Sequence, residues 1–95
     1  MIVYKLVTRE EDHGRLVSLM EKGEKQVEYK IGKAAYSAIG VLYAFDSPEG
    51  ARPWMSGPNI ELWIAEATGV TPTPYVSIVG CKSLKLLEKI APKTS

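Results

Sequence analysis

The sequence has little cysteine, little histidine and almost no excess charge. Its 95 residues include one cysteine, Cys81, and one histidine, His13. A single cysteine excludes an internal disulfide, and one cysteine with one histidine does not make a metal site. Twelve basic and eleven acidic residues give a net charge of +1, which leaves no global field to attract nucleic acid or an anionic membrane. We therefore expect no metal and no cofactor.

Long hydrophobic runs are also missing. No apolar run approaches the roughly 18 residues that a membrane-spanning helix needs. The first residues, MIVYKLV, lack the charged start, long apolar core and cleavage site of a secretory signal. These features predict a cytoplasmic protein that does not enter a membrane.

Motifs for phosphate binding or hydrolysis are absent as well. The sequence contains no G-x-G-x-x-G loop, no Walker A loop and no nucleophile elbow. His13 falls in the polar stretch REEDHG, where solvent exposure is a simpler interpretation than general-base catalysis. Glu61 and Glu66 are five positions apart, so a strand would place them on opposite faces and not as a catalytic pair. The sequence favours a protein that is not an enzyme.

The composition is that of one ordinary globular domain spanning residues 1–95. It is 45% hydrophobic and 24% charged, and a chain of this length buries enough surface for one core. Alternating apolar residues, rich in β-branched and aromatic types, predict several strands. The expected strands are 2–8, 15–20, 26–31, 36–45, 60–67 and 75–80.

Two of these assignments have a helical alternative. Residues 9–20 fit a helix beginning at Thr8, which has capping-box spacing to Glu11, but its first turns would carry no apolar residue. Residues 60–67 fit either period, and their short length favours a strand. The first three strands are expected to form an antiparallel meander.

The stretch LYAFDSPEGARPWM (residues 42–55) predicts a strand that turns into a short helix. Asp46 or Ser47 suits the N-cap, Pro48 suits the first turn, and Glu49 lies near the positive end of the helix dipole. Pro53 limits the helix to roughly two turns. We interpret the acid and the hydroxyl as capping groups, because no base is available to activate a nucleophile.

The end of the chain predicts a second helix over 83–92. Ser83 is its expected cap, Leu84, Leu87 and Ile90 form an apolar stripe, and Pro92 ends it. The predicted fold class is therefore α+β. It is a single, mainly antiparallel sheet of five to six strands, with a short helix after the fourth strand and a C-terminal helix.

Two groups of residues are candidates for binding. Trp54 and Trp63 flank the turn SGPN, and tryptophan is enriched at binding hot spots, although both could instead pack in the core. A lysine stripe on the predicted last helix could contact phosphates, although a solvated helix face is the favoured interpretation. Its members are Lys82, Lys85, Lys89 and Lys93.

The segments VYKLV, VEYKIGK, GVLYAFDSPEGA and IELWIAEA, in that order, resemble small uncharacterised prokaryotic or viral proteins. Those proteins share a Y-K-[LV]-V start and a strand followed by an S-P-E-x-A helix, and the resemblance implies no activity. The strand order is more distantly similar to ADP-ribosyltransferase-like folds. That similarity implies Arg9, Ser37 and Glu66 as the arginine, serine and glutamate of a nucleotide-binding enzyme.

The leading expectation is a non-enzymatic binding domain that contacts another protein, or a second copy of itself as a homodimer. The contact would use an exposed sheet edge or the region of Trp54 and Trp63. The alternatives are the small ADP-ribosyltransferase-like or nucleotide-binding enzyme, and a weak nucleic-acid binder that uses Lys82, Lys85 and Lys89. No motif supports nucleic acid, so it is the less favoured partner.

Overall fold

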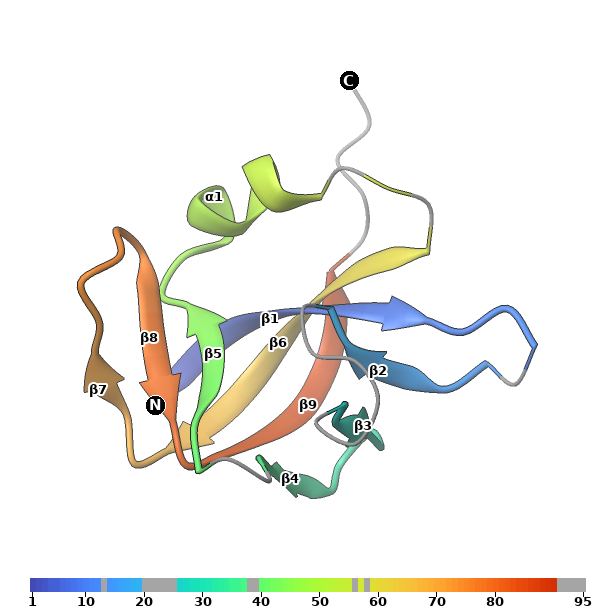
Figure 1. The fold of residues 1–95 in the computed structure, drawn as a ribbon, viewed down its shortest axis with the longest axis horizontal. Coiled ribbons are helices and arrows are strands. Elements are labelled where there is room, and N and C mark those ends of the chain that lie inside the picture. Colours follow the sequence, from blue (N-terminus) through green and yellow to red (C-terminus); the bar gives the residue numbers. More distant parts are fainter. Residues whose placement is uncertain (13, 20–25, 38–39, 56, 58, 91–95) are drawn as a thin grey trace.

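The computed structural model describes residues 1–95 except 13, 20–25, 38–39, 56, 58 and 91–95. The described residues form one nine-stranded sheet, one α-helix and one 3-10 helix (Figure 1). The elements are β1 (Ile2–Arg9), β2 (Leu16–Ser18), β3 (Glu28–Tyr29), β4 (Ala34–Tyr36), β5 (Leu42–Phe45), α1 (Pro48–Ala51), η2 (Arg52–Trp54), β6 (Ile60–Thr68), β7 (Thr71–Pro72), β8 (Ile78–Cys81) and β9 (Ser83–Ile90).

All of the strand pairs in the sheet are antiparallel. The main order is β4-β9-β6-β1-β5-β8-β7, and β2 and β3 extend from β1. The predicted meander of the first three strands is confirmed by the β1–β2 and β2–β3 pairs. A register shift between Ile64 and Ala65 interrupts the β6–β9 ladder, and such a bulge adds bend and twist to a sheet.

β1 is bordered differently on its two edges. On one edge it pairs with β6 from Ile2 opposite Glu66 to Thr8 opposite Ile60. On the other edge it pairs with β5 at Tyr4, and then with β2 from Val7 to Arg9. The second edge is therefore shared by two strands. The β5 pairing ends before Lys5 and Leu6, and the β2 pairing begins after them.

Two apolar clusters form the core. The larger lies inside the curved sheet and collects side chains from eight strands, all except β7, and from residue 27. The smaller joins Leu6, Phe45 and Leu62 to Ala51 of α1, so the helix covers the opposite face of the sheet (Figure 1). The buried members of the larger cluster are Val3, Val7, Leu16, Val27, Tyr29, Ala35, Leu42, Ala44, Trp63, Ala65, Ala67, Cys81, Leu84 and Leu86.

The predicted C-terminal helix is wrong, because residues Ser83–Ile90 form strand β9. Leu84 and Leu86 are fully buried whereas Leu87 is exposed, which is a period of two. β9 pairs with both β6 and β4. Pairing on two sides and burial of alternate leucines outweigh the local helical pattern.

The single strand predicted over 36–45 is also wrong. β4 ends at Tyr36 and β5 begins at Leu42. Between them Gly40 has a φ of 92°, and its amide donates to the Ser37 carbonyl in a turn. Glycine is suited to such a positive φ because it has no Cβ. Residues 38–39 of the predicted strand lie outside the described residues.

Other predictions are confirmed with adjusted bounds. Residues 60–67 and 2–8 are strands, and residues 9–20 contain β2 and no described helix. The short helix is present, with Ser47 as its N-cap: the Ser47 hydroxyl accepts a hydrogen bond from the Gly50 amide at 3.2 Å. The helix was expected after the fourth strand and follows the fifth, β5, because the sheet contains short strands that the sequence did not predict. None of the helices in the described ranges is long and apolar enough for a membrane crossing.

Candidate functional site

A pocket of about 630 Å³ opens where β1 changes partners. Lys5 and Leu6, the two β1 residues between the β5 pair and the β2 pairs, both line it. Its wall also takes Tyr29, Leu42 and Ala44 from the larger core cluster. The pocket therefore lies at the gap in the sheet, between the two halves of the core.

Five aromatic side chains surround this pocket. They are Tyr29, Tyr43, Phe45, Trp54 and Tyr75. Volumes of 300–1,000 Å³ and mainly apolar walls with few polar groups are typical of sites for small ligands. The pocket has both properties, since most of its described lining is aromatic or aliphatic.

Trp54 forms one side of the mouth. It comes from η2, which continues α1 and is placed by the Ser47 cap and the proline-containing stretch that follows. Its side chain is 47% exposed, and its ring centroid lies 6.2 Å from that of Phe45 at an interplanar angle of 50°. This tilted pair is within the range of favourable aromatic contacts.

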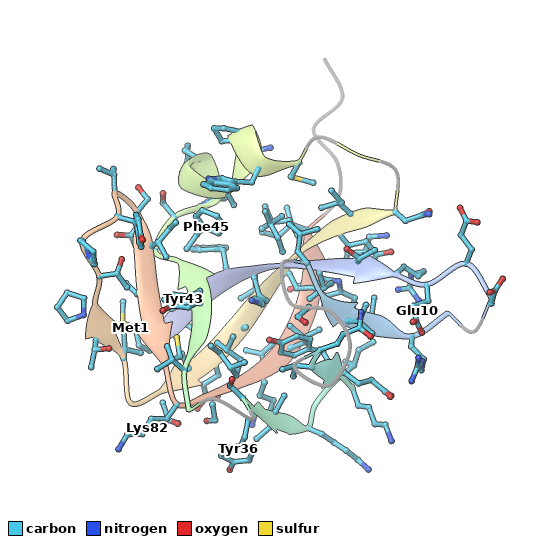
Figure 2. The ribbon with its side chains drawn as sticks, in the orientation of Figure 1. Met1, Glu10, Tyr36, Tyr43, Phe45 and Lys82 are labelled. Carbon is cyan, nitrogen blue, oxygen red and sulfur yellow. The ribbon has the colours of Figure 1, made fainter. Side chains whose placement is uncertain are left out.

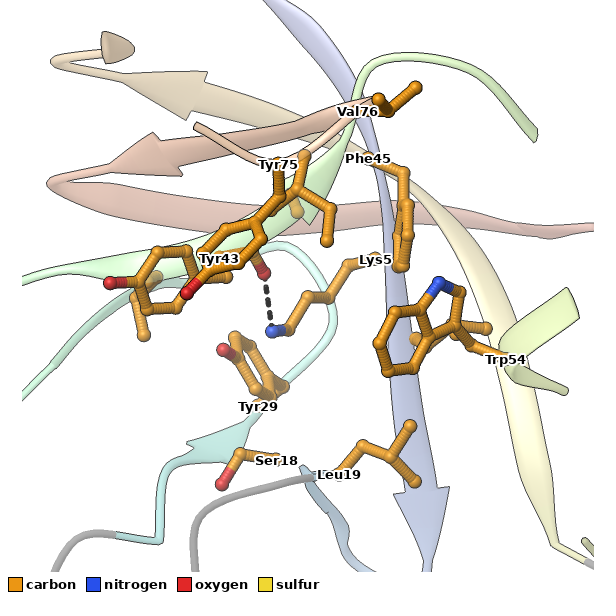
Figure 3. Close-up of a pocket in the computed structure, with 13 residues that line it drawn as sticks. Lys5, Ser18, Leu19, Tyr29, Tyr43, Phe45, Trp54, Tyr75 and Val76 are labelled. Atoms are coloured by element: carbon orange, nitrogen blue, oxygen red, sulfur yellow. Dashed lines mark hydrogen bonds between the residues drawn. The ribbon is translucent and has the colours of Figure 1, made fainter. Parts of the chain in front are cut away.

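Lys5 reaches into the pocket from β1 (Figure 3). Its Nζ donates to the Tyr43 carbonyl oxygen at 2.6 Å and lies 5.7 Å from the centroid of the Tyr29 ring. Among the described residues that line the pocket, Lys5 is the only charged one. The Lys5 ammonium thus lies next to an aromatic face in the wall of the pocket.

The loop between β7 and β8 forms the other side of the mouth. Tyr75 is 64% exposed and Val76 is 91% exposed, and both line the pocket. The loop is held by Thr73, whose Oγ1 donates to the Ile78 carbonyl at 2.6 Å. Ser77 has a φ of 63°, which is uncommon for a residue other than glycine.

The two sides of the mouth are tied to each other. The Asp46 amide, at the start of the segment leading to α1, donates to the Ser77 carbonyl at 3.0 Å. Gly50 of α1 packs so closely on the loop that an added Cβ would lie 2.5 Å from the Ser77 Cβ. A side chain at residue 50 would therefore push the loop and the helix apart.

Comparison of the chain with family models, with curated proteins and with solved structures found no match. Its function therefore has to be inferred from the geometry of the pocket and from the positions of the predicted site residues.

The structure separates the two candidate tryptophans. Trp54 lines the mouth of the pocket, as described above. Trp63 is 5% exposed and belongs to the larger core cluster, where its Nε1 donates to Glu61 Oε1 at 3.1 Å. Of the two tryptophans, Trp54 lines the pocket, whereas Trp63 packs in the core, which was the alternative considered for both.

Glu61 is the centre of a polar cluster away from the pocket. Arg9 donates to it twice, from Nε to Oε2 at 2.7 Å and from Nη2 to Oε1 at 3.0 Å. Lys89 Nζ lies 3.5 Å from Oε2. The hydrogen bonds from Arg9 lower the pKa of the Glu61 carboxyl below its ordinary value of 4.5, against an opposing effect of burial. This cluster joins β1, β6 and β9 and has a structural role.

The lysine stripe lies on a strand and is matched by acids. Lys85 Nζ lies 3.9 Å from Glu66 Oε2, and Lys89 lies near Glu61. Lys82 lies just before β9, where its side chain occupies the space beside Gly69. His13 and Lys93 lie outside the described residues. Of the stripe's described members, Lys85 and Lys89 therefore each have an acidic neighbour.

Arg9, Ser37 and Glu66 do not converge. Glu66 pairs with Ile2 at the start of β1, whereas Arg9 is the last residue of that strand. The seven steps between them span roughly 24 Å at about 3.4 Å a residue. Figure 2 shows Met1 and Glu10, which neighbour the two ends of β1, on opposite sides of the molecule. Nor do any three His, Cys, Asp or Glu side chains of the described segments form a metal-binding group.

Sequence reasoning missed Lys5, Tyr43, Tyr75 and Val76 as site residues. Lys5 lies in β1 and Tyr43 lies in β5, and both strands alternate apolar residues with other types. Many strands that bind no ligand show the same alternation, so it does not mark these two residues as a site. Tyr75 and Val76 were placed inside a predicted strand over 75–80, whereas β8 begins at Ile78. The exposure of two apolar side chains before β8 has no local sequence signal.

Proposed function

We propose that this chain is a non-enzymatic binding domain whose aromatic pocket holds an apolar group. The observation that supports the proposal is the pocket of about 630 Å³ at the gap beside β1, with its five aromatic side chains. Tyr43, Trp54 and Tyr75 remain between 47% and 64% exposed at its mouth. Large aromatic side chains kept partly in water are favourable binding contacts, because a ligand removes their apolar surface from solvent.

The experiment uses 1-naphthaleneacetamide, an uncharged aromatic probe, titrated into the ¹⁵N-labelled protein. We expect amide chemical shifts to change at Lys5, Tyr43 and Tyr75, which line the pocket on β1, β5 and the β7–β8 loop. Trp54→Ala should weaken the affinity about fivefold or more, because it removes one aromatic wall. No shift changes at millimolar probe would contradict the proposal.

Tyr36→Ala is the matched control for Trp54→Ala. Tyr36 is 69% exposed at the end of β4 and is not among the described lining residues. It therefore deletes an exposed aromatic side chain without changing the pocket wall. Equal weakening by both variants would show that the probe binds exposed rings nonspecifically and would contradict the proposal.

A protein partner, including a second copy of the chain, is the second candidate occupant. The 91% exposure of Val76 beside the pocket favours it, since exposed apolar side chains at a rim are typical of interaction surfaces. Light scattering after size-exclusion chromatography tests self-association. A homodimer that Val76→Ser dissociates would support it, and a monomer at high concentration would exclude it.

A cytoplasmic location is part of the same proposal. It rests on Cys81, the single cysteine, which is buried as a free thiol and whose pKa is raised by that burial. Such a thiol needs no oxidising compartment. Fractionation of the native host's cells, followed by immunoblotting, would contradict this part of the proposal if the protein were recovered outside the cytoplasmic fraction.

A further inference from the structure

The aromatic residues of this chain are concentrated around one pocket. The sequence has eight of them: five tyrosines, two tryptophans and one phenylalanine. Five of the eight line the pocket, namely Tyr29, Tyr43, Phe45, Trp54 and Tyr75. They come from β3, β5, η2 and the β7–β8 loop, so four separate parts of the chain contribute rings to the same space.

Three of these rings are kept partly in water. Tyr43, Trp54 and Tyr75 are 47%, 47% and 64% exposed. Figure 3 shows Trp54 on one side of the Lys5 side chain, and Tyr43 and Tyr75 on the other. A flat group that lies across the mouth would therefore contact rings on both sides, and it would remove their apolar surface from water.

The geometry points to a planar aromatic ring system as the ligand, lying across the mouth against Trp54 on one side and the two tyrosines on the other. This inference rests on the proposed function, because it names the ligand class for the same pocket. It adds one requirement, a flat π-system, that a general apolar pocket would not have.

The requirement for a ring follows from the charge distribution of the aromatic walls. Aromatic rings have a negative face and a positive edge, and they gain from offset-stacked or edge-to-face partners beyond the area that is buried. Phe45 and Trp54 already form such a pair, with centroids 6.2 Å apart and an interplanar angle of 50°. A ligand ring would extend this arrangement, whereas a saturated group of the same size would gain only from burial of area.

The volume of the pocket indicates more than one ring. A cavity of about 150 Å³ is large enough to bind benzene, whereas this pocket has about 630 Å³. A fused ring system therefore has room in it, and such a system has enough surface to contact Trp54 and Tyr75 together.

The test compares two probes that differ in aromaticity, titrated into the ¹⁵N-labelled protein. They are 1-naphthaleneacetamide and its ring-saturated analogue, decahydro-1-naphthaleneacetamide, which has the same heavy atoms. We expect the aromatic probe to bind about threefold to tenfold more tightly, because ring contacts add to the effect of burial. Burial of apolar area alone predicts equal or tighter binding of the saturated probe.

Variants at the mouth link this preference to the rings. Tyr75 is 64% exposed in the β7–β8 loop, so its replacement should leave the fold intact. Tyr75→Leu keeps an apolar side chain and should reduce the preference for the aromatic probe about twofold or more. Tyr75→Phe retains the ring and should keep the preference, which separates the ring from the hydroxyl. Trp54→Leu tests the opposite side of the mouth and should also reduce the preference.

Tyr36→Leu is the matched control for these variants. Tyr36 is 69% exposed and is outside the described lining, so its replacement removes an exposed ring but no part of the pocket wall. It should leave the preference unchanged. If it reduced the preference as much as Tyr75→Leu does, the aromatic probe would be binding to exposed rings in general, and the inference would be overturned.

The outcomes separate this inference from the proposed function. Equal or tighter binding of the saturated probe would overturn the ring requirement and leave the binding function in place. A preference that survives both Tyr75→Leu and Trp54→Leu would do the same. Failure of both probes to bind would overturn both the inference and the proposed function.

Discussion

The two edges of β1 differ: one carries a continuous ladder, and the other borders the pocket. On the β6 edge, pairing runs without a gap from Ile2 to Thr8, and a buried carboxylate reinforces it through Arg9. On the other edge β5 and β2 divide the strand between them, and the pocket lies where they part. An uninterrupted ladder on one edge holds the strand in place, so the other edge can border a pocket without loss of the sheet.

Leu62→Ala should have the largest effect on this comparison. Leu62 lies opposite Leu6 on the uninterrupted edge and is 2% exposed. Its truncation should lower the free energy of unfolding by about 2–5 kcal/mol, because a buried cavity remains. Urea denaturation followed by circular dichroism measures this loss, and a change below about 1 kcal/mol would show that the β6 edge is not the main source of stability.

Glu61→Gln should have the next largest effect and should depend on pH. The folded protein lowers the pKa of Glu61, so its ionised form contributes stability in full above pH 4.5. That contribution is lost as the pH falls through the lowered pKa of the folded state. We expect Glu61→Gln to lose about 1–2 kcal/mol at pH 7, since hydrogen bonds to a charged group are replaced by neutral ones.

The measurement for Glu61 is urea denaturation of both proteins across the acid range. The difference between wild type and Glu61→Gln should shrink as the pH falls below 4.5. Glu66→Gln is the control, because the Glu66 side chain is 53% exposed and the Nζ of Lys85 lies 3.9 Å from its carboxylate. A difference that stays constant with pH would mean that ionisation of Glu61 does not stabilise the fold.

Trp54→Ala should affect stability less than either change on the β6 edge. Trp54 is 47% exposed and contacts Phe45 at the mouth of the pocket, so its loss should cost about 1 kcal/mol in urea denaturation. Its effect on probe binding should nevertheless be marked. Global unfolding of this variant would mean that the pocket wall is also essential to the core, and the contrast between the two edges would fail.

Lys85→Ala should have the smallest effect. The Lys85 and Glu66 side chains are 40% and 53% exposed, and exposed ion pairs contribute about 0.2–1 kcal/mol. We expect a change in unfolding free energy below about 0.5 kcal/mol and no effect on binding of 1-naphthaleneacetamide. A larger loss of stability would show that the outer face of β9 matters more to the sheet than its exposure indicates.

The local parts of the fold could be predicted from the sequence. Alternation predicts β1, the short length of 60–67 favours β6 as a strand, and the Ser47 cap with Pro48 predicts the short helix, because each depends on residues close in the chain. The segment 83–90 has leucines that fit either period. Its strand conformation is decided by β6 and β4, which are distant in sequence.

The site was less predictable because it depends on long-range pairing. Trp54 was identified from its residue type and its neighbouring turn, but Trp63 gave the same local signal and is buried. Lys5, Tyr43 and Tyr75 come together only because β1 changes partners beside them. The local pattern of residue types along one strand does not indicate where its neighbouring strands separate.

The hydrogen bond from the Asp46 amide to the Ser77 carbonyl, and the close packing of Gly50 on that residue, tie the β7–β8 loop to the start of α1 at the mouth of the pocket. A molecule that enters therefore meets rings already in position, and little side-chain or loop freedom is lost when it is held.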